Sequence, residues 1–208
     1  MTHKSIKHNP YKIVQMFEEE VAEYTRAPFA VSVDSCTNAL FLVCKYYKVT
    51  EATIPKRTYL SVPMSIMHAG GDVVFEDRDW KGIYQLKPYP IYDSAKRFTS
   101  DMYIPGTAMC LSFHIKKLLS IGKGGMILTD NYKMVEWLRK ARYEGRGEVN
   151  YKDDSIDMLG WNMYMTPQQA AHGLSLMQNY PEHVDDLAEN NGYRDLTEFP
   201  IFKDCKIL

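Results

Sequence analysis

Short apolar segments of strand type alternate with helical segments along most of the chain, and this alternation constrains the fold more than any other feature of the sequence. Segments 29–33 and 72–76 are rich in valine and phenylalanine, which favour strands. Segment 11–24 instead repeats its apolar side chains at helical spacing. Alternation of this kind predicts an α/β fold with a mostly parallel sheet.

The other elements follow from the same two periodicities. We expect helices at 11–24, 38–47, 62–69, 132–143 and 167–178, and strands at 29–33, 52–55, 72–76, 90–93, 109–113 and 126–129. The start of the last helix is the most specific, because Thr166-Pro167-Gln168-Gln169 combines a capping-box pattern with proline in the first turn. Residues 145–157 are polar and predict a surface loop, and a further segment begins at Pro181 and reaches about residue 190.

Charge and composition exclude several classes of function. The 25 Lys and Arg residues against 26 Asp and Glu residues give a formal net charge of -1, which is no electrostatic footprint for nucleic acid. No apolar run approaches the roughly 20 residues that span a bilayer, and the polar N-terminus lacks the apolar core of a signal peptide. The four cysteines form no CxxC pair, and the six histidines show no metal-ligand spacing. We therefore expect a cytoplasmic protein with no metal site and no nucleic-acid or membrane partner.

Two polar features directly follow predicted strands. Residues 34–38, Asp-Ser-Cys-Thr-Asn, lie at a strand-to-helix turn, where free N–H groups and the helix dipole suit a phosphate. Many such turns only cap a helix. Asp93 follows the short apolar strand 90–92, in the position where ligand groups gather in open α/β sheets. An isolated aspartate there is more often a turn residue.

A third feature is the lysine pair Lys116-Lys117 after strand 109–113. A lysine in the turn after a buried strand suits Schiff-base chemistry when burial favours its neutral amine, and the alternative for both lysines is a solvated loop charge. The following glycine run, 122–125, does not fit a Walker phosphate loop. A phosphate turn, a carboxylate and a lysine in this order are the layout of a pyridoxal-phosphate site.

Longer stretches carry a resemblance to a known family. They read FEEEVAEYTRAPFAVSVDSCTNAL, ATIPKRTYLSVPMSIMHAGGDVVFEDRD, PIYDSAKRF, LSFHIKKLLSIGKGGMILTDN and LGWNMYMTPQQAAHGLSLMQ. On these stretches the chain resembles the DegT/DnrJ/StrS-type nucleotide-sugar aminotransferases, over roughly residues 11–178. The resemblance implies the aspartate-aminotransferase fold (fold type I), a three-layer α/β/α arrangement with a mostly parallel mixed sheet. It implies a domain at 1–180 that binds pyridoxal phosphate, and a helical remnant of a small domain at 181–208.

The resemblance also implies the residues that carry the chemistry. Lys117, five places after Ser112, matches the Schiff-base lysine of the family. Asp93 matches the carboxylate that keeps the pyridine nitrogen of the cofactor protonated, so that the ring can act as an electron sink. The phosphate would be bound by the Ser112 hydroxyl and by the turn Ser35-Cys36-Thr37, through the N–H groups of Cys36 and Thr37 and the Thr37 hydroxyl.

Three further residues complete the implied cofactor site. Tyr59 matches an aromatic residue that stacks on the cofactor ring, and Lys96 stands where a glutamine usually contacts the phenolic oxygen of the cofactor. Asn162 matches an asparagine that reaches the phosphate across a dimer interface, which implies a homodimer with shared active sites. The chain departs from the family pattern at four positions, which are Cys36 (usually Gly), Lys96 (usually Gln), Lys123 (usually acidic) and Tyr164 (usually Arg).

The implied activity is amino transfer from an amino acid, glutamate in most relatives, to the keto group of a nucleotide-linked sugar, as in the synthesis of amino sugars for polysaccharides. Retention of Lys117 argues against the sugar dehydratases, in which histidine replaces the lysine. The alternative is a non-catalytic protein that binds pyridoxal phosphate or a nucleotide sugar, or the partner subunit of a split enzyme.

Overall fold

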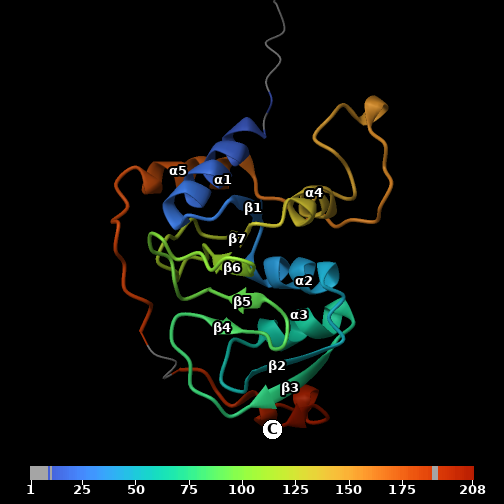
Figure 1. Ribbon diagram of the computed structural model, residues 1–208, viewed down its shortest axis with the longest axis vertical. Coiled ribbons are helices and arrows are strands. Elements are labelled where there is room, and N and C mark those ends of the chain that lie inside the picture. Colours follow the sequence, from blue (N-terminus) through green and yellow to red (C-terminus); the bar gives the residue numbers. More distant parts are fainter. Residues whose placement is uncertain (1–8, 10, 189–191) are drawn as a thin grey trace, which may run out of the picture.

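A mixed β-sheet lies between two layers of helices in the computed structural model, which describes residues 9, 11–188 and 192–208 (Figure 1). Five strands pair in the order β1 (Phe29–Val33), β7 (Gly125–Thr129), β6 (Ala108–Ser112), β5 (Ile91–Asp93) and β4 (Tyr84–Gln85). Three more pair in the order β2 (Glu51–Pro55), β3 (Asp72–Glu76) and β8 (Lys206–Ile207). An antiparallel bridge between Thr53 and Lys87 joins the two groups at β2 and the end of β4.

The strand directions confirm the mostly parallel mixed sheet. β5 pairs parallel with β6, and β3 pairs parallel with both β2 and β8. β7 runs antiparallel to its neighbours β1 and β6, and β4 runs antiparallel to β5. Through the Thr53–Lys87 bridge, six of the eight strands therefore point the same way, and only β4 and β7 oppose them.

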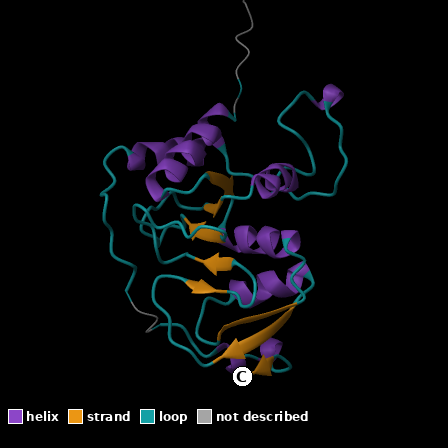
Figure 2. Ribbon diagram, viewed as in Figure 1, coloured by secondary structure: helices purple, strands orange, loops and turns teal. Residues whose placement is uncertain are grey.

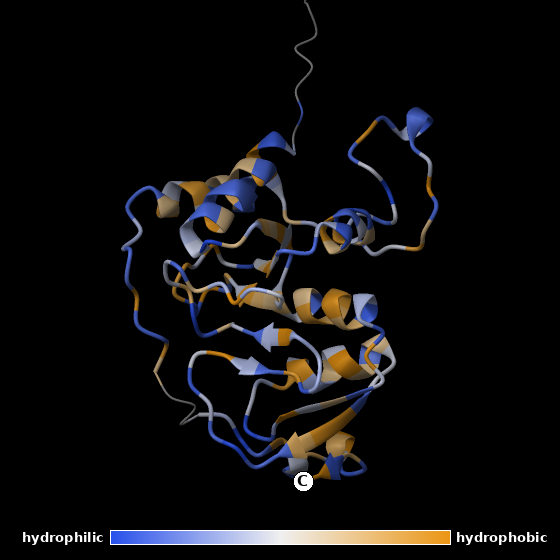
Figure 3. Ribbon diagram, in the orientation of Figure 1, coloured by the Kyte–Doolittle hydropathy of each residue, from blue (hydrophilic) through white to orange (hydrophobic). Residues whose placement is uncertain are grey.

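Helices cover both faces of this sheet, which confirms the expected three layers (Figure 2). α1 (Lys12–Thr25) and α5 (Pro167–Met177) cover one face, while α2 (Cys36–Tyr46), α3 (Ser61–Ala69) and α4 (Tyr132–Ala141) cover the other. Successive strand residues serve opposite faces, since Ile127 packs with the α2 side and Met126 and Leu128 with the α1 side. The exposed helix surfaces carry the hydrophilic residues (Figure 3). No described helix has the length and apolar character needed to cross a membrane.

Most element boundaries lie within two residues of their predicted positions, and those of β1 and β3 coincide with them. The capping box at Thr166 is confirmed, with the Thr166 and Gln169 side chains each bonded to the other residue's backbone N–H. α2 begins two residues earlier than predicted, at Cys36, because the Ser35 side chain accepts a hydrogen bond from the Asn38 N–H and caps the helix. The short strands β4 and β8 were not predicted from the sequence.

The C-terminal segment differs from its prediction. A helical remnant was expected from residue 181, but residues 181–188 are extended, and the described part of 192–208 holds only two short 3-10 turns (Leu196–Glu198 and Pro200–Phe202) and β8. The backbone of residues 181–188 bonds to other parts of the chain, as the Leu187 N–H does to the Lys96 carbonyl in the loop after β5 (2.9 Å). Residues 189 and 190 of the predicted segment lie outside the described part of the chain.

Candidate active site

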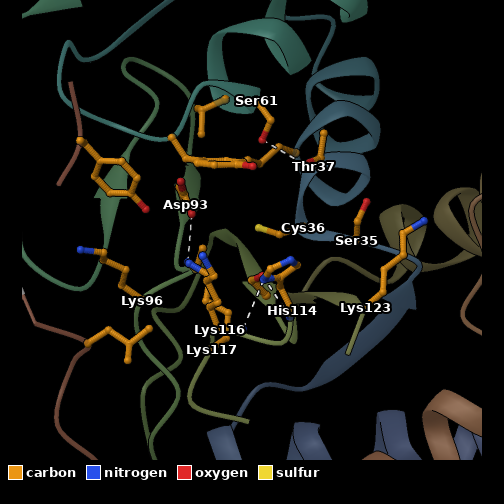
Figure 4. Close-up of a pocket in the computed structure, with 18 of the residues that line it drawn as sticks. Ser35, Cys36, Thr37, Ser61, Asp93, Lys96, His114, Lys116, Lys117 and Lys123 are labelled. Atoms are coloured by element: carbon orange, nitrogen blue, oxygen red, sulfur yellow. Dashed lines mark hydrogen bonds between the residues drawn. The ribbon is translucent and has the colours of Figure 1, made fainter. Parts of the chain in front are cut away.

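A cavity of about 480 Å³ opens where β5 and β6 end, beside the first turn of α2 (Figure 4). Ligand sites of open α/β sheets form at this edge, where the strands end and helix N-termini converge. The cavity is lined by all the predicted site residues except Asn162, which are Ser35, Cys36, Thr37, Tyr59, Asp93, Lys96, Ser112 and Lys117. It is also lined by Trp80, His114, Lys116, Lys123 and Tyr193, among others.

The turn between β1 and α2 supplies an anion site at one end of the cavity. Ser35 is the N-cap of α2, so Cys36 and Thr37 are in the first helical turn, where backbone N–H groups have no intrahelical acceptor. These N–H groups and the helix dipole favour a negative charge. The Thr37 hydroxyl donates to the Ser61 hydroxyl across 2.9 Å, and Asp34 accepts a hydrogen bond from the Asn38 amide (2.6 Å).

Gly125 allows this turn to lie directly against the sheet. A Cβ atom on Gly125 would lie 2.4 Å from the carbonyl carbon of Ser35 and 2.5 Å from the backbone nitrogen of Cys36. Backbone atoms cannot move aside as the end of a flexible side chain can, so only glycine fits. The glycine run 122–125, which the sequence analysis could only exclude as a Walker loop, therefore has a role in shaping the anion site.

Asp93 lies at the opposite side of the cavity, as the last residue of β5. Its carboxylate is buried and accepts hydrogen bonds from the Tyr84 hydroxyl and from the Ala95 N–H, both across 2.9 Å. Burial raises the pKa of Asp93, although these bonds and the charge of Lys117 oppose the shift. A cationic nitrogen on a ligand would therefore relieve the cost of ionising this carboxyl group.

The two candidate lysines differ in their surroundings. Lys116 is exposed, whereas Lys117 is half-buried and donates its backbone N–H to the His114 carbonyl in a turn (2.8 Å). The charge of Lys117 lowers the pKa of Asp93, while Lys116 is not among the causes of that shift. The Lys117 amine is thus the one that lies within electrostatic reach of the buried carboxylate.

Lys96 lines the cavity, but its ammonium group is bonded to the C-terminal segment. Its Nζ atom donates to the Ala188 carbonyl (2.9 Å) and lies 5.0 Å and 5.5 Å from the ring centroids of Tyr193 and Trp80. Burial lowers the pKa of Lys96, and the charge of Lys117 acts in the same direction.

The remaining predicted residues occupy three different environments. Ser112 ends β6 and its hydroxyl accepts the His114 N–H (3.4 Å), while Tyr59 stands at the cavity mouth with 54% of its surface exposed. Asn162 lies outside this cavity and donates its side-chain amide to Glu144 (2.8 Å). The sequence analysis expects Asn162 in the site of a partner copy, and that expectation stays a prediction.

Trp80 and Tyr193 are two lining residues to which the sequence assigned no role. Their rings stack with centroids 6.2 Å apart and an interplanar angle of 19°. No spacing or motif joins them, because only the course of the C-terminal segment brings the two rings together. Their one sequence signal was the general excess of aromatic residues, which fits core positions equally well.

The groups around the cavity fit pyridoxal phosphate. This cofactor presents a phosphate, a basic ring nitrogen and an aldehyde, and the cavity offers the α2 N-terminus, the buried Asp93 and the Lys117 amine. Cys36, which replaces the usual glycine, directs its Sγ atom to the Cys110 carbonyl (3.5 Å) and leaves its N–H in the first turn. Within the described residues, no group of three or more His, Cys, Asp or Glu side chains is arranged to hold a metal ion.

Comparisons with known proteins agree with this site. Residues 2–100 and 104–195 match the model of the DegT/DnrJ/EryC1/StrS aminotransferase family. Among individual proteins, the chain is 27% identical to the spore coat polysaccharide biosynthesis protein SpsC of Bacillus subtilis (strain 168), over 84% of this chain and 57% of that protein. It is 24% identical to the GDP-perosamine synthase of Escherichia coli O157:H7, over 85% of this chain and 60% of that protein.

Solved structures of the same fold also match. The aminotransferase PseC of Helicobacter pylori, involved in the biosynthesis of pseudaminic acid, superposes with a TM-score of 0.70 at 17% identity, over 82% of this chain and 58% of that one. A structure described as the PMP form of a sugar aminotransferase from Streptococcus pneumoniae gives 0.68 at 17% identity, over 81% and 59%. The chain therefore spans less than two thirds of the length of these relatives.

Proposed function

The chain belongs to the DegT/DnrJ/EryC1/StrS aminotransferase family, and we propose that it is a pyridoxal-phosphate-dependent enzyme that aminates the keto group of a nucleotide-linked sugar with glutamate as the donor. The observation that carries this proposal is the convergence of Lys117, Asp93 and the turn 35–37 on one cavity. These groups come from three separate parts of the chain, which are the end of β5, the start of α2 and the loop after β6, so their convergence requires the whole fold. The activity of the related GDP-perosamine synthase supports a nucleotide sugar as substrate.

Binding of the cofactor is divided among several elements in this proposal. The N–H groups of Cys36 and Thr37 hold the phosphate, together with the hydroxyls of Thr37 and Ser112, which line the same cavity. The Tyr59 ring covers the cofactor ring from the cavity mouth, and Asn162 would reach the phosphate in a neighbouring copy of a homodimer. Most of these contacts are backbone or hydroxyl donors on regular elements, which hold their positions before the cofactor arrives.

Asp93 and Lys117 perform the chemistry in this proposal. Bound pyridoxal phosphate supplies an electron sink, because its protonated ring withdraws electrons from the reacting carbon. Asp93 pairs with the ring nitrogen and keeps the proton there. Because the Asp93 carboxylate is buried and is held by the Tyr84 hydroxyl, its site favours a cationic nitrogen. The Lys117 amine would hold the cofactor at its aldehyde carbon, and it would carry the proton between the Cα atom of the amino acid and C4′ of the cofactor.

Amino transfer by purified protein tests the proposal. The chain is incubated with pyridoxal phosphate, glutamate and a panel of nucleotide-linked keto sugars, and the amino sugar and 2-oxoglutarate are measured by mass spectrometry. Lys117→Ala should abolish both products, whereas Lys116→Ala, which removes the exposed neighbour, should retain them. If the wild type binds the cofactor tightly but forms no amino sugar from any donor and acceptor, the protein is a binding protein or a partner subunit and the proposal is wrong.

A further inference from the structure

One polar group of the cofactor has no partner in the proposed site. The phosphate, the ring nitrogen and the aldehyde are assigned to the turn 35–37, Asp93 and Lys117, which leaves the phenolic oxygen of the ring. The resemblance suggests position 96 for this contact. Lys96 Nζ is instead bonded to the Ala188 carbonyl and lies beside two aromatic rings. The question is therefore which cavity residue faces this oxygen.

The C-terminal segment forms the cavity wall on the side of Lys96 (Figure 4). Leu187 and Tyr193 line the cavity from this segment. The loop after β5 holds the segment at several points, which include the Leu187 N–H to the Lys96 carbonyl (2.9 Å) and both guanidinium bonds from Arg97 to Asp186 (2.7 Å each). This wall is therefore anchored and not a loose tail.

Tyr193 offers the missing hydrogen-bond donor. Its ring is fixed by Trp80 at 6.2 Å, by Tyr59 at 6.4 Å and by the Lys96 ammonium at 5.0 Å. Its hydroxyl has no hydrogen-bond partner among the described residues, although the side chain lines the cavity. Burial raises the pKa of Tyr193 to about 12, and the charge of Asp93 acts in the same direction, so the hydroxyl stays protonated at neutral pH.

On the basis of the proposed function, we propose that Tyr193 is a cofactor-contact residue whose hydroxyl donates a hydrogen bond to the phenolic oxygen of pyridoxal phosphate. Lys96 is the positioning residue that holds the Tyr193 side chain in place. The groups whose charges act on Tyr193 are Asp93, Tyr59 and Cys36, all of which the proposed function assigns to the cofactor. Tyr193 therefore lies near the residues that the proposed function assigns to the cofactor, in the wall of the same cavity.

The test follows the visible absorbance of bound pyridoxal phosphate as a function of pH, without a turnover assay. A hydrogen bond to the deprotonated oxygen favours that form, so its loss should raise the pH midpoint of the absorbance change. Tyr193→Phe keeps the ring contacts and removes only the hydroxyl. We expect the midpoint to rise by about one pH unit and the Kd for pyridoxal phosphate to rise about 10-fold, as loss of a bond to a charged group implies. Tyr132→Phe, at an exposed position on α4, is the matched control and should change neither value.

Lys96 is tested by a double-mutant cycle. Lys96→Met should also raise the midpoint, and Lys96→Arg, which keeps a cation near both rings, should restore part of the effect. If Lys96 acts by positioning Tyr193, the effects of Lys96→Met and Tyr193→Phe should fall short of additivity in the double variant. Full additivity would show that Lys96 acts on the cofactor by its own charge and would overturn its positioning role.

The remaining outcomes separate this inference from the proposed function. If Tyr193→Phe binds pyridoxal phosphate with the same pH midpoint and Kd as the wild type, the assignment of Tyr193 is wrong and the proposed function is unaffected. A wild-type protein that shows no cofactor absorbance at all overturns the proposed function, and the assignment of Tyr193 with it.

Discussion

The two walls of the cavity are built in different ways. The turn wall, formed by Ser35–Thr37, Ser112 and Gly125, consists mainly of backbone groups at the ends of strands and at the start of α2. The C-terminal wall, formed by Leu187 and Tyr193, belongs to an extended segment that side chains of the loop after β5 hold in place. The first wall is a product of local sequence and regular structure, whereas the second depends on contacts between residues about 90 positions apart.

This difference predicts different rigidity. The turn wall is backed by β1, β6 and β7, whose residues are almost all buried, so it should open only when the domain unfolds. The C-terminal wall is held by one bidentate ion pair, a few hydrogen bonds and the buried Leu196 and Phe202. The C-terminal wall should therefore open at a lower free energy than the turn wall. Six substitutions, at four positions of the site and its walls and at two control positions, test this comparison.

The largest effect is expected at Asp93, which lies between the two walls. Asp93→Asn removes the anion that pairs with the ring nitrogen and should weaken pyridoxal-phosphate binding about 100-fold or more, as loss of one partner of a buried pair does. Equilibrium dialysis at several cofactor concentrations measures this change. A loss of less than 5-fold would mean that Asp93 does not face the cofactor nitrogen.

The same variant should stabilise the cofactor-free protein. The pKa of Asp93 is raised by burial, so the folded state holds this proton to higher pH than the unfolded state. Stability is therefore lost as the pH rises from the usual pKa of aspartate through the raised one, and the penalty is complete above it. Asp93→Asn should raise the Tm at pH 8 by about 2–4 °C, and the gain should shrink toward pH 5. A lower Tm at pH 8 would contradict this explanation.

Gly125→Ala tests the backbone geometry of the turn wall. The new Cβ would overlap the carbonyl carbon of Ser35 and the nitrogen of Cys36. We expect about 10- to 100-fold weaker cofactor binding, from an overpacking cost of about 1–3 kcal/mol. Gly124→Ala is the control, because its Cβ would first meet the flexible Ile121 side chain. Equal effects of the two variants on the Kd would show that the close approach to the turn is unimportant.

Arg97→Met tests how the C-terminal wall is held. It leaves the nearly buried Asp186 carboxylate without its two guanidinium bonds, at a cost of about 1–3 kcal/mol. Hydrogen exchange should become faster in residues 182–188, while exchange in β6 and β7 stays unchanged. Arg26→Met removes an ion pair of which both partners are exposed and should have no such effect. Faster exchange in β6 and β7 as well as in residues 182–188 would mean that the two walls unfold together.

The smallest effect is expected at Lys123, at the rim of the turn wall. Its ion pair with Asp34 spans 3.1 Å, but 64% of the Lys123 side chain is exposed. Lys123→Ala should therefore change the free energy of unfolding by less than about 1 kcal/mol. Chemical denaturation in low and high salt measures this value. A larger, salt-insensitive loss would show that Lys123 has a structural role in the turn.

The turn wall could be predicted from the sequence, whereas most of the C-terminal wall could not. β1, the turn 34–38 and the capping box at Thr166 could be predicted because their signals are local: apolar alternation, cap residues and proline in a first turn. The extended course of 181–188 could not, because its backbone bonds go to Tyr24 and to residues 96–100 and not to its neighbours in sequence. Tyr193 was missed for the same reason. Lys96 was identified, but the direction of its ammonium group depends on where Ala188 lies.

Borohydride reduction tests whether Lys117 holds the cofactor, on which the proposed chemistry depends. The purified chain is titrated with pyridoxal phosphate, reduced, digested and mapped by mass spectrometry. We expect a visible absorbance band on binding and, after reduction, a single pyridoxyl label on Lys117, with none on the exposed Lys116. A label on Lys116, or one spread over several surface lysines, would contradict it.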